Sequence, residues 1–260
     1  SPIDSKRYVN FLKTAPHRIH KGKKDHLNSY PQQFSPFSDN KSSASTCVVG
    51  DAIPKCGTYL LNAIIKSIGT WESLKTHITP THYHIKPESG YEILHPCLPR
   101  YALKKLRNGQ FVAAHFQYER TIEKIIEKET PDRKIKHLFM YRDPRDSWIS
   151  YTRFITYSET ARLISPGYAK FQKYIQDAFE NDDDRLEHIL KHCYHYYSVL
   201  YLPWLESKYA HVIRFEDLYP DILKLKEGVW GDTIKGILKY LEVDLNTIDP
   251  IKFHRSEERR

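Results

Sequence analysis

The chain has 260 residues, 40% of them hydrophobic, which is enough to bury the core of one large domain or two small ones. No apolar run approaches the roughly 20 residues needed to span a bilayer, and the N-terminus carries no stretch typical of a signal peptide. The cysteines Cys47, Cys56, Cys97 and Cys193 form no CxxC pair, which argues against a disulfide scaffold. We therefore expect a cytoplasmic protein with free thiols, bearing in mind that a trimmed anchor or signal leaves no trace.

The formal net charge is +8, and residues 1–46 alone carry +5 of it. Such a basic segment is compatible with an arm that binds nucleic acid or an anionic membrane. No aromatic residue interrupts the basic run HRIHKGKK to stack on bases, so a solvated tail is favoured and no nucleic-acid partner is expected. Residues 28–46 are rich in Ser, Pro, Asn and Gln, which indicates a linker or ordered coil. We predict a basic, polar segment over 1–46 and a domain over 47–260.

The elements predicted along the domain alternate between strands and helices. Val48–Ile53 is an apolar run that ends at Pro54, and Thr58–Ile68 has apolar residues at i, i+4 and i+8, typical of a helix. Residues 70–100 are rich in Pro and His and are predicted to be irregular. The other predicted strands are 110–116, 135–141 and 211–215, and the other predicted helices are 119–128, 144–154, 168–179, 184–201 and 231–241. This order predicts an α/β fold, with a parallel sheet between two layers of helices, like that of P-loop nucleotide kinases.

The sequence PKCGT joins the first predicted strand to its helix. A helix N-terminus presents backbone N–H groups and partial positive charge, which suits phosphate or sulfate. Gly57 allows close approach of the backbone, Lys55 adds a charge and Thr58 adds a hydroxyl donor. This is no Walker A sequence, because the lysine precedes the glycine. An ordinary turn with an exposed lysine is the alternative interpretation of this segment.

A second anion-suited segment, MYRDPRDSWISYTRF, follows the strand predicted over 135–141. Arg142 comes directly after that strand, and Ser150 lies eight residues later in the next helix. Ligands of open parallel sheets sit at the carboxyl ends of the strands, and arginine is suited to bidentate phosphate recognition. A surface cluster of salt bridges at a helix start is the alternative.

The two segments resemble the signature motifs of sulfotransferases that use 3′-phosphoadenosine 5′-phosphosulfate (PAPS). PKCGTYLL resembles their PKSGTTWL motif, YRDPRDSWISYTRF resembles the second motif, and HVIRFEDL resembles the later YED segment. The resemblance covers Cys47 to Leu241. It implies an enzyme that moves a sulfuryl group from PAPS to a hydroxyl or amine acceptor, with PAP as the product, by in-line transfer without a metal.

The resemblance also implies roles for individual residues. His115, at the end of FVAAHF, matches the catalytic histidine, which acts as a general base. Arg142 and Ser150 match the residues that hold the 3′-phosphate. The residues that match the 5′-phosphosulfate motif are Lys55, Cys56, Gly57, Thr58 and Tyr59.

This chain departs from the family pattern at several positions. Leu60 stands where many members have a tryptophan beside the adenine, and Ala113 stands where cytosolic members often have a second lysine. Phe215 replaces the tyrosine of the YED segment. FHRSEERR stands where members often have the glycine-rich RKGxxGxW loop over the nucleotide.

Other histidines compete with His115 for a functional role. His77, His82 and His84 are predicted to be loop residues that line an acceptor pocket. The second group, predicted on one helix near Cys193, has metal-ligand spacing, but packing on the helix surface is the favoured interpretation and no metal is expected; it consists of His188, His192 and His195.

Two functional alternatives stay open at this point. One is a nucleotide-kinase-like phosphotransferase, and the other is a degenerate, non-catalytic sulfotransferase fold that binds acidic partners. The acceptor is either a small molecule, for which aromatic-rich segments 77–101 and 151–175 would form a pocket, or an acidic glycan. The oligomeric state is not predicted.

Overall fold

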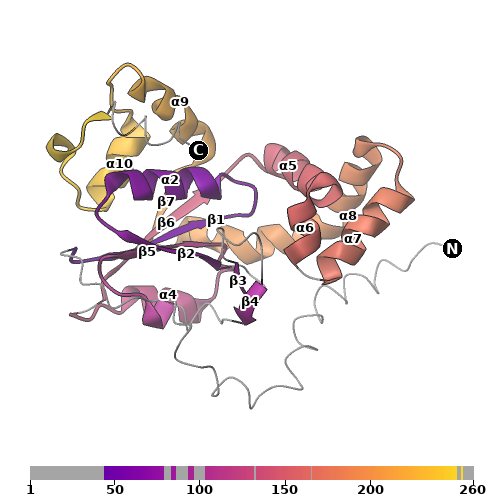
Figure 1. Ribbon diagram of the computed structural model, residues 1–260, viewed down its shortest axis with the longest axis horizontal. Coiled ribbons are helices and arrows are strands. Elements are labelled where there is room, and N and C mark those ends of the chain that lie inside the picture. Colours follow the sequence, from indigo (N-terminus) through magenta and orange to yellow (C-terminus); the bar gives the residue numbers. More distant parts are fainter. Residues whose placement is uncertain are drawn as a thin grey trace, which may run out of the picture.

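The computed structural model describes residues 44–78, 83–85, 93–96, 103–131, 133–164, 166–250 and 253. Their centre is a seven-stranded sheet with strand order β4-β3-β2-β5-β1-β6-β7 (Figure 1). The strands are β1 (Cys47–Ala52), β2 (Glu72–Ile78), β3 (Tyr83–Ile85), β4 (Ile93–Pro96), β5 (Gln110–Ala114), β6 (Ile135–Tyr141) and β7 (Ala210–Arg214). The five strands from β2 to β7 in the sheet order pair in parallel, which confirms the predicted fold class.

The prediction that residues 70–100 are irregular is wrong, because β2, β3 and β4 lie there. β3 pairs antiparallel with β2, and β4 pairs antiparallel with β3, so the sheet is mixed at this edge. β2 pairs with β5 through a register irregularity between Ser73 and His77. The sequence of β2, ESLKTHI, is largely polar, and its pairing with β5 rather than its own pattern makes it a strand.

Helices cover both faces of the sheet, as the three-layer prediction requires (Figure 1). On one face, α2 (Thr58–Ile68), α9 (Phe215–Leu225) and α10 (Asp232–Tyr240) pack against Val48, Ala52 and Met140. On the other face, α4 (Arg120–Glu127) and the 3-10 helix η4 (Leu202–Glu206) pack against Val49 and Phe139. β1 is buried throughout, so alternate residues of this strand belong to different cores.

The remaining helices form a separate cluster beside the sheet, around Trp148, Ile155 and Phe171. They are α5 (Pro144–Tyr157), α6 (Glu159–Ile164), α7 (Pro166–Ala178) and α8 (Asp182–Tyr201). α5 begins as its sequence predicts: Pro144 occupies the first turn, and Asp143 accepts a hydrogen bond from Arg145 N at 2.9 Å. Sequence analysis missed α6 and α9. In α9 the internal Pro220 resembles a helix breaker, although the helix continues past it.

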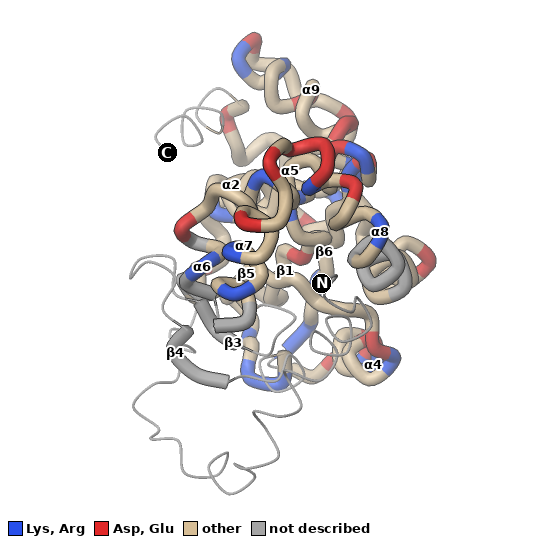
Figure 2. The backbone as a smooth tube through the Cα atoms, turned by 90° about the vertical axis from the view of Figure 1, so that its right-hand side faces the viewer, with Lys and Arg blue, Asp and Glu red and all other residues tan. Residues whose placement is uncertain are grey.

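Lys and Arg residues are dispersed over the described elements rather than gathered along one of them (Figure 2). Within the described part of the chain, no helix has the length and apolar composition that crossing a membrane demands. The predicted basic segment 1–46 lies outside the described residues apart from its last three. Of these, Thr46 accepts hydrogen bonds from Trp71 Nε1 and from Gly109 N.

Candidate functional site

The turn between β1 and α2 has a backbone that few sequences adopt. Lys55 has φ of 70° and Gly57 has φ of 96°. A Cβ atom at Gly57 would lie 2.7 Å from Cδ2 of Phe215, so a side chain there would meet both a strained φ and a clash. α2 then begins at Thr58 with no side-chain cap and no acidic residue in its first turn. The first turn of α2 therefore keeps the electrostatic character that suits an anion.

The other side chains of this turn point in different directions. Lys55 Nζ lies 4.4 Å from the centre of the Phe154 ring on α5, a cation–π contact. Thr58 is buried, whereas Tyr59 is 65% exposed. Burial raises the pKa of the Cys56 thiol to about 12, so this sulfur is an uncharged group that packs. Cys56 therefore differs little from the serine of the resembled motif, provided that the backbone does the binding.

Arg142 lies beside this turn because β6 and β1 are neighbours: Ile53 N donates to Met140 O at 3.0 Å. The guanidinium of Arg142 lies 4.7 Å from the centre of the Phe215 ring, the same ring that crowds Gly57. Its Nη2 donates to Asp146 Oδ2 at 3.0 Å. Its Nε is buried, 3.9 Å from Glu216 Oε1, and makes no hydrogen bond among the described residues. The guanidinium of Arg142 therefore lies between two carboxylates, those of Asp146 and Glu216.

Ser150 lies in the second turn of α5 and is partly exposed. It precedes Phe154 by four residues, so both lie on the same side of the helix. Since Lys55 contacts Phe154, α5 connects the β1–α2 turn to the predicted 3′-phosphate residues. The seven residues predicted for the cofactor therefore come from three adjoining segments of the fold.

His115 directly follows β5, next to the end of β1. Its backbone N donates to Ile78 O at 2.8 Å, and its Nδ1 lies 2.6 Å from Ala52 O. Because a carbonyl only accepts, Nδ1 carries the proton, and Nε2 of the neutral ring keeps its lone pair. Burial lowers the pKa of His115 and the charge of Lys55 lowers it further, while the Ala52 hydrogen bond and the Asp51 charge oppose the shift. The imidazole is therefore neutral near pH 7.

The loop interpretation of His77 and His84 is wrong, since they lie in β2 and β3; His82 lies outside the described residues. The ring centres of His77 and His115 are 4.4 Å apart. Burial, followed by the neighbouring His115, lowers the pKa of His77 well below its usual value. His77 is thus a neutral neighbour of His115, placed there by the long-range pairing of β2 with β5.

Two of the histidines of α8, His188 and His192, make a tilted ring contact. The rings of His188 and His192 are 4.5 Å apart, and burial lowers the pKa of His188 to about 4. The side chains of Cys193 and His195 lie outside the described residues. Elsewhere in the described chain, no three His, Cys, Asp or Glu side chains are grouped to hold a metal.

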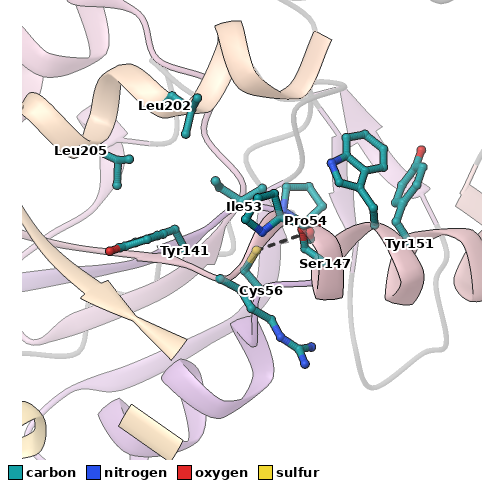
Figure 3. Close-up of a pocket in the computed structure, with 11 residues that line it drawn as sticks. Ile53, Pro54, Cys56, Tyr141, Ser147, Tyr151, Leu202 and Leu205 are labelled. Atoms are coloured by element: carbon teal, nitrogen blue, oxygen red, sulfur yellow. Dashed lines mark hydrogen bonds between the residues drawn. The ribbon is translucent and has the colours of Figure 1, made fainter. Parts of the chain in front are cut away.

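A pocket of about 220 Å³ adjoins the turn between β1 and α2 (Figure 3). Tyr141 and Leu205 lie at one end of it and Tyr151 at the other, with Pro54 and Cys56 between them (Figure 3). Most of its lining is aromatic or aliphatic: Ile53, Pro54, Cys56, Tyr141, Arg142, Pro144, Ser147, Trp148, Tyr151, Leu202 and Leu205. Tyr151 belongs to a segment predicted to line an acceptor pocket. The other such segment, 77–101, is described only in part.

Sequence reasoning missed two residues of this region. The first is Phe154, whose ring makes the cation–π contact with the Lys55 ammonium. In the sequence it resembles any apolar residue of an amphipathic helix. Asp51 is fully buried at the end of β1, where it contacts Phe116 and His137. Its signal in the sequence was a single charged residue within the apolar run VVGDAI.

Comparisons with known proteins identify the family and the fold of the chain. The family model described as "Sulfotransferase domain" matches residues 48–246. Among solved structures, mouse sulfotransferase SULT7A1 complexed with PAP matches with a TM-score of 0.51 and 18% identity, over 86% of this chain and 71% of that one. This second likeness shows a shared fold. The search of curated proteins gave no match. Because the family model matches most of its length, the chain belongs to the sulfotransferase family.

Proposed function

We propose that this chain transfers a sulfuryl group from PAPS to a hydroxyl or amine acceptor, with His115 as the general base. The observation that carries the proposal is the assembly of three groups at neighbouring strand ends: the β1–α2 turn, Arg142 and His115. Resemblance gave each residue its role, and the contacts through Phe215 and Ala52 support their acting together.

Two independent observations support the fit of these residues to such a nucleotide. The first is that Gly57 has φ of 96° and precedes an N-terminus of α2 that has no side-chain cap, an arrangement that suits a phosphate. The second is that Arg142 has a buried Nε without a hydrogen-bond acceptor among the described residues. Lys55, Cys56, Gly57, Thr58 and Tyr59 would hold the 5′ end of the nucleotide. Arg142 and Ser150 would hold its 3′-phosphate.

The chemistry divides between the donor and the residues of the chain. PAPS supplies the sulfuryl group and departs as PAP. His115 Nε2 accepts the proton of the attacking hydroxyl or amine, while Nδ1–H remains bound to Ala52 O and fixes the ring. Lys55 and the N-terminus of α2 stabilise the negative charge that develops on the departing phosphate. In-line transfer requires that the acceptor lie beside His115 and face the turn.

The pocket beside the turn is not lined by His115 or Lys55, but its apolar and aromatic lining, next to Cys56 and Arg142, favours a small apolar or aromatic acceptor over an acidic glycan. A carbohydrate acid would leave many polar groups against side chains such as Tyr141, Trp148 and Leu205, at a cost in desolvation. A screen with labelled donor should therefore give transfer to phenols or sterols and little to sulfated or uronic-acid polymers. Transfer to the polymers alone would contradict this part of the proposal.

Thermal unfolding in the presence of nucleotides tests the function. At a hundred times its Kd, a ligand that binds only the folded state stabilises it by about 2.7 kcal/mol. We expect PAP to raise the unfolding temperature and ATP with magnesium to leave it nearly unchanged. Stabilisation by ATP and magnesium alone would favour the kinase-like alternative. PAP binding without any sulfuryl transfer across the acceptor screen would favour the non-catalytic alternative.

Replacing Arg142 with alanine should mainly weaken donor binding. A charged hydrogen bond contributes about 1.5–3 kcal/mol, so the Kd for PAP should rise by roughly ten- to a hundredfold. Arg145→Ala is the matched control: its side chain is 86% exposed and pairs with Asp143 in the same helix start. Calorimetric titration of PAP into both variants measures the difference. Equal PAP affinities of the two variants would show that Arg142 does not bind the nucleotide.

The titration of His115 should be shifted to lower pH. Its folded-state pKa is lowered, so the neutral ring persists below the usual midpoint near 6.5 and protonates only as the pH falls further. Histidine NMR of the nucleotide-free protein should show a midpoint below 6.5 and, at pH 7, the tautomer with the proton on Nδ1. His115→Gln identifies the resonance by its loss. A midpoint above 7 would show that the ring is charged at neutral pH and unfit as the base.

A further inference from the structure

A buried acid and a buried imidazole lie in the sheet directly behind the candidate base. Asp51 on β1 and His137 on β6 are both fully buried, and His137 Nε2 lies 3.0 Å from Asp51 Oδ2. The neighbouring residues of these strands, in CVVGDA and IKHLFMY, are mostly apolar. Burying such a pair is costly, and hydrophobic residues of similar volume often serve stability equally well. The pair therefore calls for an explanation besides stability.

The hydrogen bond made by the second oxygen of Asp51 provides such an explanation. Asp51 Oδ1 accepts a hydrogen bond of 2.8 Å from the backbone N of Phe116, the residue after His115. Trp204 Nε1 donates to Phe116 O at 2.8 Å. The residue that follows His115 is thus held through both its N–H and its C=O by fully buried side chains.

His137 orients the carboxylate. Because an ionised carboxylate only accepts, His137 Nε2 carries the proton of this contact. Its Nδ1 is buried and has no hydrogen-bond partner among the described residues. The ring packs edge-on against Trp204, with centres 4.6 Å apart. His137 thus fixes one oxygen of Asp51 and leaves the other for Phe116.

We infer that Asp51 is a positioning residue, which holds the segment after His115 through Phe116 and keeps a negative charge near the imidazole. The inference deepens the proposed function and rests on it, because it concerns the same base. Three other groups bear on this arrangement: Lys55 from the turn and His77 from β2 face His115, and His137 from β6 faces Asp51. Of the two charges near His115, that of Asp51 raises its pKa and that of Lys55 lowers it.

Removal of the Asp51 charge should make His115 a weaker base. In Asp51→Asn the amide oxygen can still accept from Phe116 N, but the negative charge is gone. The NMR midpoint of His115 in the nucleotide-free protein should then fall by on the order of one pH unit. The value of kcat should fall about tenfold or more, while the Kd for PAP stays within about twofold. A shift in midpoint together with a loss of kcat is not expected from a purely structural role.

His137→Gln is the matched control, since it alters the other half of the same buried pair and leaves the Asp51 charge. Its His115 midpoint should stay within a few tenths of the wild-type value. Should Asp51→Asn fail to fold, Asp51→Ser, which is also uncharged, carries the same comparison.

Three results would overturn the inference: an unchanged midpoint in the uncharged variant, an equal shift in His137→Gln, or an unchanged kcat in a variant whose midpoint has moved. If the wild-type protein transfers no sulfuryl group, the proposed function fails. The NMR comparison then still decides whether Asp51 acts on His115.

Discussion

Replacement of His115 by alanine is expected to lower kcat by about a hundredfold or more, while PAP continues to bind with nearly wild-type affinity. The imidazole is fixed by the bond from Nδ1 to Ala52 O, which leaves Nε2 as the proton acceptor. The turn that would bind the nucleotide begins directly after Ala52, and its backbone is held by hydrogen bonds from Ile53 N to Met140 O and from Cys56 N to Ile53 O. Steady-state kinetics at saturating donor, together with PAP titration, measures the two effects separately.

A second substitution at the same position distinguishes the role of His115 as a base from its role in holding the backbone. His115→Asn removes the basic nitrogen but provides an amide N–H that can still donate to Ala52 O, so its kcat should be nearly as low as that of the alanine variant. His77→Gln is the control for the neighbouring ring, because it leaves His115 in place. Nearly full turnover in His115→Ala would refute the assignment. A hundredfold loss of kcat in His77→Gln, without such a loss in His115→Ala, would identify His77 as the base.

Lys55→Ala should weaken both PAP binding and turnover, the latter by about a hundred- to a thousandfold. Its ammonium is the only cationic side chain of the turn between Ile53 and Thr58, and the departing phosphate gains charge as transfer proceeds. The loss should therefore be larger in the transition state than in the complex with PAP. The ratio of the change in kcat/KM to the change in PAP affinity measures this difference.

Two further variants test whether the effect of Lys55→Ala comes from the lost charge at this position. Lys55→Met keeps an unbranched side chain to pack on Phe154 and removes the charge, so it should behave like the alanine variant if charge is what matters. Lys66→Ala removes a lysine from the last turn of the same helix, far from the turn with β1, and should be close to wild type. Equal behaviour of the Lys55→Ala and Lys66→Ala variants would place the anion site elsewhere.

The parts of the fold that sequence reasoning predicted are those with local signals. α2 was predicted with both of its ends, because its apolar repeat runs over Thr58–Ile68. The predicted start of α5 at residue 144 is also correct, because proline at the first position of a helix is a local signal. The cluster of Lys55, Gly57 and Thr58 was recognised for the same reason: its residues are adjacent in the sequence.

The parts that were missed depend on residues far apart in the chain. β2 is a strand through its pairing with β5, and this pairing also brings His77 to His115. Asp51 is separated by 65 residues from Phe116 and by 86 from His137, so nothing local marked its role. Phe215 was noted only as a departure from the family motif, yet its ring lies against both Gly57 and Arg142. In each case tertiary structure, rather than local pattern, determines the neighbour.

A structure of the protein in complex with PAP tests the central claim most directly. The account predicts the 5′-phosphate of PAP at the N-terminus of α2, within hydrogen-bond distance of backbone N–H groups of the turn and of Lys55 Nζ. It also predicts the 3′-phosphate at Arg142 and the Nε2 atom of His115 facing the 5′ end. PAP bound at another surface, or at this turn with His115 directed away from it into the core, would contradict the account.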